Sequence, residues 1–295
     1  MEEPFHFWNG ERIVTMNVLQ AAVLGIIQGL AEFLPISSSG HLEIAQRLMG
    51  LQADSMSMML LTVLLHVGTL AAVIVVFWKD WIDILKNLFH SKLLGLLILA
   101  SLPAIIVKLG LKAIDVDIDA LFGGGFLGIG FLVTCVFLVL AEVFSRRGRH
   151  HAKRQVEVKN ALVMGCFQAL AMLPGVSRSG SSTLGGTATG LTKRNAIRFS
   201  FLMSAPAVLG SLILEGKDAY ELGAFDFLTE NLVPVIVGVL LAAVIGFFTA
   251  RIMLRIVNKV SFAWFALYVL LIGAAVIVMQ VTGTAGFPPI SLPFS

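Results

Sequence analysis

The stretch QGLAEFLPISSSGH, from Gln28 to His41, breaks an otherwise apolar segment with a carboxylate, a proline, three serines, a glycine and a histidine. Pro35 lacks a backbone N–H and restricts the residue before it, so we expect the incoming helix to end near Ile36. The hydroxyls and the glycine of Ser37–Gly40 suit the start of a second helix, whose N-terminal N–H groups and dipole favour an anion. The stretch therefore predicts a broken helix that carries polar groups into apolar surroundings.

The composition is that of a protein that crosses a membrane several times. Of the 295 residues, 57% are hydrophobic and 13% are charged, and the mean hydropathy is +0.91. Ordinary soluble domains carry about 25% charged residues, so a water-soluble fold is excluded. The net charge of +3 is small, and nothing suggests a nucleic-acid partner. The N-terminal MEEPFHFWNGER has no basic region followed by a cleavage site, so we expect no removable signal peptide.

Six uncharged runs approach the roughly 20 apolar residues that a spanning helix needs. They cover residues 55–78, 93–107 (stretching to Lys112), 120–141, 195–214, 231–250 and 261–281. Two more apolar runs, 13–31 and 160–176, are each followed by a proline and a Ser/Gly cluster, which is typical of a helical hairpin that enters the membrane and turns back. We therefore expect an all-α integral membrane protein, one domain over 1–295, with six transmembrane helices and two re-entrant hairpins at about 16–49 and 159–190.

The charge distribution sets the expected orientation, because Lys and Arg accumulate on the cytoplasmic side. The basic segment 146–159 is placed inside and the acidic segment 215–230 outside. The cations of 193–198 stay inside only if the run 160–176 returns to the side from which it enters. Following the spans from there puts Asp115, Asp117 and Asp119 outside, and both termini outside. The first hairpin then enters from outside and the second from the cytoplasm.

The two halves of the chain resemble one another. QGLAEFLPISSSG at Gln28–Gly40 is similar to QALAMLPGVSRSG at Gln168–Gly180. Each half, 13–145 and 159–281, consists of one hairpin and three spans, and three crossings reverse the orientation of the second half. This pattern predicts an inverted-topology repeat, in which the two breaks approach each other near the membrane midplane.

The two breaks together supply the groups of an oxyanion site, for phosphate above other anions. Gln28 and Glu32 share one helical face, and Arg178 can bind phosphate with two hydrogen bonds. The simpler alternative is that Glu32 and Arg178 only neutralise each other, but such a pair needs no flanking hydroxyls and glycines. His66 fits a packed histidine as well as a site residue. The candidates are Gln28, Glu32, Ser37, Ser38, Ser39, Gly40 and His41 from the first break, and Ser177, Arg178, Ser179, Gly180 and Ser182 from the second.

QGLAEFLPISSSGH and PGVSRSGSS, at this separation and within this pattern of spans, closely resemble the two signature motifs of the undecaprenyl-diphosphate phosphatases of the bacitracin-resistance type. The similarity extends over nearly the whole chain, including LLHVGTLAAV around His66 and FSFLMSAPAVLG after Arg198. It implies hydrolysis of undecaprenyl diphosphate to undecaprenyl phosphate, the carrier lipid that bacteria reuse for peptidoglycan and other envelope polymers, and it implies bacitracin resistance.

The resemblance also implies roles for individual residues. It makes Glu32, Ser38, His41 and Arg178 catalytic and Glu32 a metal ligand. Because Gln28 is the amide variant of the family's first carboxylate, a two-carboxylate metal site is not expected. A divalent cation, Mg²⁺ or alternatively Ca²⁺, would be held by Glu32, substrate oxygens and water. The expected location is the bacterial cytoplasmic (inner) membrane, with the site open to the outer, periplasmic face.

Two mechanisms stay open at this point. In the first, Ser38 attacks the phosphate after His41 accepts its proton. In the second, Glu32 or His41 activates a water molecule that attacks directly. In both, Arg178, the N–H groups of the hairpins and the cation hold the diphosphate.

Three other classes of function share features with this sequence. The type-2 phosphatidic-acid phosphatases share the SGH of Ser39–His41, but Leu184 stands where their final histidine is required and their Lys-then-Arg-Pro motif is absent, so we reject that class. A transporter or a polyprenyl-phosphate translocase uses the same inverted-repeat architecture. A lipid-binding scaffold without catalysis is the third alternative. A homodimer is possible.

Overall fold

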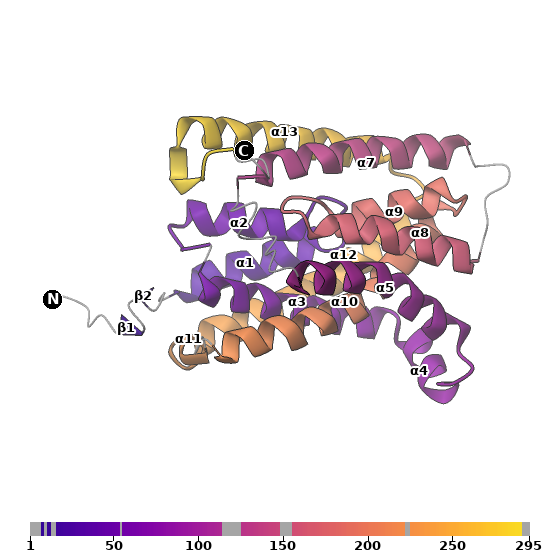
Figure 1. Ribbon diagram of the computed structural model, residues 1–295, viewed down its shortest axis with the longest axis horizontal. Helices are drawn as coiled ribbons and strands as arrows, with labels where there is room; N and C mark the ends of the chain where they lie inside the picture. Colours follow the sequence, from indigo (N-terminus) through magenta and orange to yellow (C-terminus); the bar gives the residue numbers. More distant parts are fainter. Residues whose placement is uncertain are drawn as a thin grey trace.

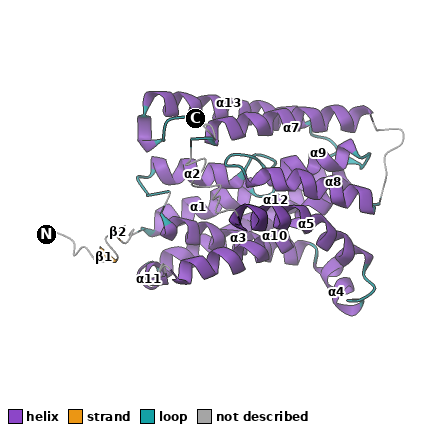
Figure 2. Ribbon diagram, viewed as in Figure 1, coloured by secondary structure: helices purple, strands orange, loops and turns teal. Residues whose placement is uncertain are grey.

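The computed structural model describes residues 7–8, 11–12, 16–53, 55–113, 125–147, 155–221 and 225–290. These residues are almost entirely helical (Figure 2). Their strands are limited to β1 (Phe7–Trp8) and β2 (Glu11–Arg12), which pair antiparallel. Asp115, Asp117 and Asp119, which we placed outside the membrane, lie beyond the described residues, as do residues 148–154 of the basic segment.

Among the described residues, six long helices are apolar enough to cross a membrane, which confirms the six predicted spans. The chain is a multispanning membrane protein. The helices are α3 (Met56–Val76), α5 (Lys92–Ala113), α7 (Leu127–Arg147), α10 (Lys193–Glu221), α12 (Leu232–Ile256) and α13 (Phe262–Thr282). Several extend beyond the apolar runs; α7 continues from residue 141 to Arg147, because a helix needs its own backbone hydrogen bonds and not an apolar surface to continue.

Four of the short helices lie between the long ones. Figure 1 shows α7 and α13 side by side along one edge of the molecule, with these four short helices in a central band. The four are α1 (Val18–Ala31), α2 (Ser38–Leu48), α8 (Val158–Ala169) and α9 (Arg178–Ala188), and the remaining short elements are α4 (Trp78–Lys86), α11 (Phe225–Glu230), η1 (Leu170–Met172) and η2 (Thr284–Gly286). None of the four central helices has the length of a membrane span.

Each half of the chain packs its first short helix against a long helix of the other half. Gly25 on α1 lies so close to α12 that a Cβ there would collide with the carbonyl of Gly238. Gly165 on α8 lies equally close to Ala100 on α5. Small residues allow such backbone approach between helices in membranes, where packing rather than hydrophobicity drives association. The two crossings bring the polar breaks that follow α1 and α8 into the middle of the bundle.

The first break occurs earlier than we expected. α1 ends at Ala31, and Glu32 caps it by donating its N–H to the Gln28 carbonyl at 3.0 Å. Pro35 has no N–H to continue the ladder, and the chain closes into turns instead, with the N–H of Ile36 donating to Leu34 O at 2.8 Å. Glu32 therefore sits at the end of a helix, with its carboxylate beside the break.

A buried carboxylate at the far end of α7 serves packing. Glu142 accepts from Lys193 Nζ at 2.5 Å, from Arg146 Nε at 2.6 Å and from the N–H of Phe262 at 2.9 Å. Lys193 begins α10 and Phe262 begins α13. Glu142 thus joins the starts of two spanning helices to the end of a third, and sequence reasoning did not single it out.

Candidate functional site

The two polar breaks are in direct contact. The Arg178 guanidinium donates through Nη2 to Glu32 Oε1, across 146 positions of sequence. Ser179 Oγ donates to the Leu34 carbonyl at 3.3 Å. Both contacts join the segment before α2 to the start of α9, so residues from the two motifs share one site.

Glu32 is the centre of this site. It is 6% exposed, and its second oxygen, Oε2, accepts from Ser38 Oγ at 2.7 Å and from Gln28 Nε2 at 3.2 Å. His66 Nε2 lies 3.5 Å from the same oxygen, while its Nδ1 lies 2.7 Å from the carbonyl of Thr62. The structure therefore brings His66 into the site, which the sequence left undecided. Among the described residues, one carboxylate collects the donors of both motifs.

An unusual turn aims Ser38 at Glu32. Ser37 has φ +71°, a conformation that few residues other than glycine adopt. Its hydroxyl caps α2 by accepting from the N–H of Gly40 at 3.4 Å, and a Cβ on Gly40 would lie 2.7 Å from the Phe131 ring. Ser39 follows the turn on the exposed side of α2. Backbone strain of this kind persists only where the surroundings hold it, and it gathers at functional sites.

The second break is anchored from α7. Thr134 Oγ1 donates to the Gly175 carbonyl at 3.0 Å and accepts from the N–H of Ser177 at 2.9 Å. A Cβ on Gly130, one turn earlier, would collide with the Pro174 carbonyl. Ser177 in turn caps α9 at the N–H of Gly180, 3.1 Å away. Thr134 was missed at the sequence level, because nothing in an apolar span marks one threonine as the support of a distant loop.

The other hydroxyls of the second break already have partners in the protein. Ser182 Oγ lies 2.8 Å from the Arg178 carbonyl and 2.7 Å from Ser200 Oγ. Ser179 Oγ lies 3.4 Å from Ser177 Oγ in addition to its bond to Leu34. The structure thus groups the predicted substrate-binding serines around Arg178, where their hydroxyls stabilise the loop backbone.

His41 is held apart from Ser38. Its Nδ1 lies 2.7 Å from the Ser37 carbonyl and its Nε2 lies 2.9 Å from the Tyr268 hydroxyl. Within the described part of the chain, no hydrogen bond joins His41 to Ser38. The hydrogen-bond partner of the Ser38 hydroxyl is Glu32, where sequence reasoning had assigned that place to His41. Tyr268 was not among the predicted residues.

The chain is similar to known proteins over most of its length. The model of the family described as bacitracin resistance protein BacA matches residues 21–275. The chain belongs to the BacA family. It is 37% identical to the undecaprenyl-diphosphatase of Carboxydothermus hydrogenoformans, over 91% of this chain and 99% of that protein. It is 39% identical to undecaprenyl-diphosphatase 4 of Bacillus thuringiensis (90% and 99%) and 35% identical to the undecaprenyl-diphosphatase of Rhodopirellula baltica (90% and 98%).

The few oxygen donors of this BacA-family site suit a divalent cation that is bound mostly by substrate phosphates and water. Among the described residues there is no cluster of three or more His, Cys, Asp or Glu side chains that could hold a metal ion. Gln28 Oε1, however, is buried without a hydrogen-bond partner, and the Gln28 amide is bonded to Glu32. Mg²⁺ is commonly bound by one or two carboxylates together with substrate phosphates and water. Glu32 and Gln28 fit that donor set.

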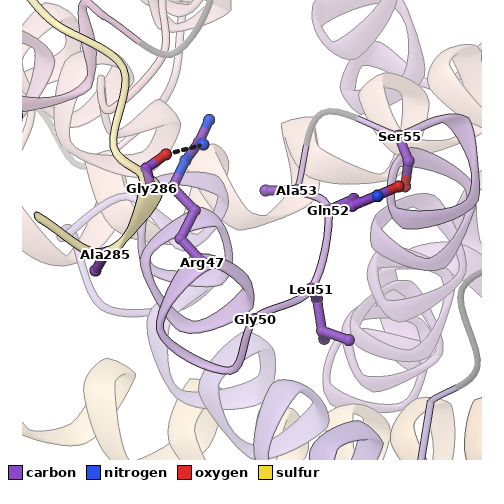
Figure 3. Close-up of a pocket in the computed structure, with 8 residues that line it drawn as sticks. All are labelled: Arg47, Gly50, Leu51, Gln52, Ala53, Ser55, Ala285 and Gly286. Carbon is purple, nitrogen blue, oxygen red and sulfur yellow. Dashed lines mark hydrogen bonds between the residues drawn. The ribbon is translucent and has the colours of Figure 1, made fainter. Parts of the chain in front are cut away.

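A separate cavity lies at the C-terminal end of α2. It has a volume of 610 Å³, and Figure 3 shows Arg47 beside it, donating from Nη1 to the Gly286 carbonyl at 2.9 Å. The lining residues are Arg47, Gly50, Leu51, Gln52, Ala53, Ser55, Ala285 and Gly286. No candidate site residue lines it. The cavity belongs to the junction between α2 and the segment that follows α13.

Proposed function

We propose that this protein hydrolyses undecaprenyl diphosphate to undecaprenyl phosphate and inorganic phosphate. The activity recycles the carrier lipid of envelope polymers and confers resistance to bacitracin, which fits the family description and the names of the relatives. The observation that carries the proposal at the site is a hydroxyl bonded to a carboxylate, Ser38 to Glu32, directly beside a guanidinium. A nucleophile, a base and an anion-binding group are thus within reach of one phosphate.

Arg178 binds the diphosphate in this mechanism. Its Nη2 is engaged with Glu32, and the guanidinium has other N–H groups to donate to phosphate oxygens. The N-terminus of α9, which begins at Arg178, adds backbone N–H groups and a favourable dipole. Phosphoryl transfer depends mainly on such positioning and charge stabilisation. His66 faces Glu32 through Nε2 at 3.5 Å, and because its Nδ1 lies against the Thr62 carbonyl, Nε2 donates on this side only when the ring is protonated.

Ser38 is the proposed nucleophile and Glu32 the proposed base. The Oγ–Oε2 distance of 2.7 Å is within the range for direct proton transfer. Ser38 Oγ forms a bond to the terminal phosphorus, its proton passes to Glu32, and the bond from phosphorus to the bridging oxygen breaks. Undecaprenyl phosphate leaves, and water then hydrolyses the phosphoserine to restore Ser38 and release inorganic phosphate. The alternative is direct attack by a water molecule held at Glu32, with Ser38 only orienting the carboxylate.

A divalent cation, Mg²⁺ in preference to Ca²⁺, completes the proposed site. When bound to Glu32 and Gln28 it neutralises charge on the diphosphate. We expect a chelator to abolish phosphate release, and Mg²⁺ to restore it. Full activity of protein shown by elemental analysis to be free of divalent metal would contradict this role. Mg²⁺ binding measured by calorimetry does not depend on catalysis, and we expect Glu32→Gln to weaken this binding.

We further propose that α1–α2 and α8–α9 are re-entrant hairpins of an inverted repeat, with halves 13–145 and 159–281. Three observations support this. Ser37 and Ser177 cap α2 and α9 in the same way, through Gly40 and Gly180. α1 and α2 have 14 and 11 residues, against 12 and 11 for α8 and α9. The crossing of Gly25 with α12 mirrors that of Gly165 with α5.

The proposed orientation places both termini outside the cytoplasmic membrane and opens the site to the outer face. The support is the distribution of Lys and Arg along the sequence. In a variant lacking the free Cys135 and Cys166, a cysteine at exposed Ser39 should react with a membrane-impermeant thiol reagent added outside intact cells. Labelling only after the cytoplasm is made accessible would contradict this orientation.

Phosphate release by the purified protein tests the function. In detergent with Mg²⁺, the protein should release one phosphate from each undecaprenyl diphosphate and leave the monophosphate lipid. A pure translocase would move the lipid between leaflets of a vesicle and release no phosphate, and a scaffold would bind it without turnover. Absence of phosphate release from folded protein would therefore reject the proposal. The mass of the protein in its detergent complex tests whether the protein is a homodimer.

A further inference from the structure

Both ring nitrogens of His41 are engaged. Nδ1 lies 2.7 Å from the Ser37 carbonyl, and a carbonyl only accepts, so Nδ1 carries the hydrogen. Nε2 of the neutral ring is then an acceptor, and the Tyr268 hydroxyl, 2.9 Å away, donates to it. Neither nitrogen is left to accept the proton of Ser38, which is directed at Glu32.

Two aromatic rings fix the plane of the imidazole. The Tyr268 ring is stacked on it, with centroids 5.6 Å apart and an angle of 9° between the planes. The Phe131 ring meets it edge to face at 5.2 Å and 89°. Tyr268 thus contributes both its ring and its hydroxyl to His41, from a helix 227 residues away in sequence.

His41 in turn supports the turn that carries Ser38. The Ser37 carbonyl accepts both the Nδ1–H and the backbone N–H of His41, the latter at 3.2 Å. Ser37 is the residue with φ +71°, a conformation that needs such support to persist. A continuous series of contacts therefore runs from Tyr268 through His41 and Ser37 to the hydroxyl beside Glu32.

We propose that Tyr268 is a positioning residue for phosphate release. It holds His41 in the Nδ1–H tautomer, and His41 holds the Ser37 turn that presents Ser38 to Glu32. The inference rests on the proposed function and deepens it, because it gives His41 a place in the architecture of the nucleophile turn and leaves proton transfer to Glu32.

The first test is Tyr268→Phe in the full-length purified protein. This change keeps the stacked ring and removes only the hydroxyl. We expect kcat for undecaprenyl diphosphate to fall about 3- to 10-fold, the effect of one neutral hydrogen bond, with KM unchanged. The matched control is Thr282→Val, which removes another hydroxyl from α13, one that donates to the Val278 carbonyl at 2.8 Å, and which should leave kcat and KM as in wild type. A wild-type kcat for Tyr268→Phe would overturn the proposal.

The second test asks whether Tyr268 acts through His41. In a His41→Ala background, Tyr268→Phe should cause no further loss, because residues that act through one another are not additive. The same fold-loss in both backgrounds would overturn the proposal. ¹⁵N NMR of histidine-labelled protein adds a readout without turnover: His41 should be in the Nδ1–H tautomer, and Tyr268→Phe should shift its Nε2 signal. An Nε2–H tautomer would overturn the inference alone, whereas a correct tautomer in a protein without phosphatase activity would overturn the proposed function alone.

Discussion

Replacing Glu32 by glutamine is expected to lower phosphate release about 10²- to 10⁴-fold, the usual contribution of a general base. The amide keeps the size of the side chain and can still accept a hydrogen bond from Arg178, but it cannot accept the Ser38 proton. It also removes the negative charge between Arg178 and His66. The measurement is kcat for undecaprenyl diphosphate with the purified variant.

Glu43→Gln provides the matched control for Glu32→Gln. Glu43 lies on α2, and like Glu32 it forms an ion pair with an arginine, Arg47, at 3.0 Å. The proposed mechanism gives Glu43 no role in proton transfer or phosphate binding, so we expect Glu43→Gln to change kcat far less than Glu32→Gln. If Glu32→Gln kept more than a tenth of wild-type kcat, Glu32 would not be the base.

Replacing Ser38 by alanine is expected to lower kcat at least about 1,000-fold, because the nucleophile is removed while the guanidinium and the helix N-termini remain. The change also removes the donor at 2.7 Å from Glu32. Wild-type protein quenched in acid during a single turnover should carry a phosphate on Ser38, detectable by mass spectrometry of the peptide that contains it.

The same pair of measurements separates the two mechanisms. Direct attack by water predicts no phosphoserine at any time and a Ser38→Ala variant that keeps part of its activity. Ser145→Ala is a suitable control, since Ser145 Oγ donates to the Glu142 carbonyl at the end of α7. An unphosphorylated Ser38 throughout the turnover would reject the covalent route and leave Glu32 as the base for water.

The spans could be predicted from the sequence because hydrophobic length is a local property. The break at Pro35 could be predicted for the same reason, although α1 ends at Ala31 and not near Ile36. That the two breaks meet could be predicted from the similarity of the two motifs, whereas the direct pair of Glu32 with Arg178 was expected only under the simpler alternative in which the two charges neutralise each other. These features depend on composition, periodicity and self-similarity, all of which a single sequence contains.

The connections within the site could not be predicted in this way. Spacing along α2 puts Ser38 and His41 on one face and suggested that they bond, but the positive φ of Ser37 turns the Ser38 hydroxyl toward Glu32. Tyr268 reaches His41 from α13 and Thr134 reaches the second break from α7. Such contacts depend on how each long helix is rotated about its own axis. In an apolar span, hydrophobicity varies little around the helix, so the sequence does not reveal that rotation.

The most direct measurement is a double-mutant cycle between the two motifs, with Glu32→Asp and Arg178→Lys. Each variant keeps its charge and moves or reshapes it, so both should retain measurable kcat/KM. If one site contains both groups, the double variant should lose less than the product of the two single losses, by about 3-fold or more, as expected for residues in contact. Losses that multiply without coupling would show that the two motifs act at separate places, and would contradict the single site on which the whole mechanism depends.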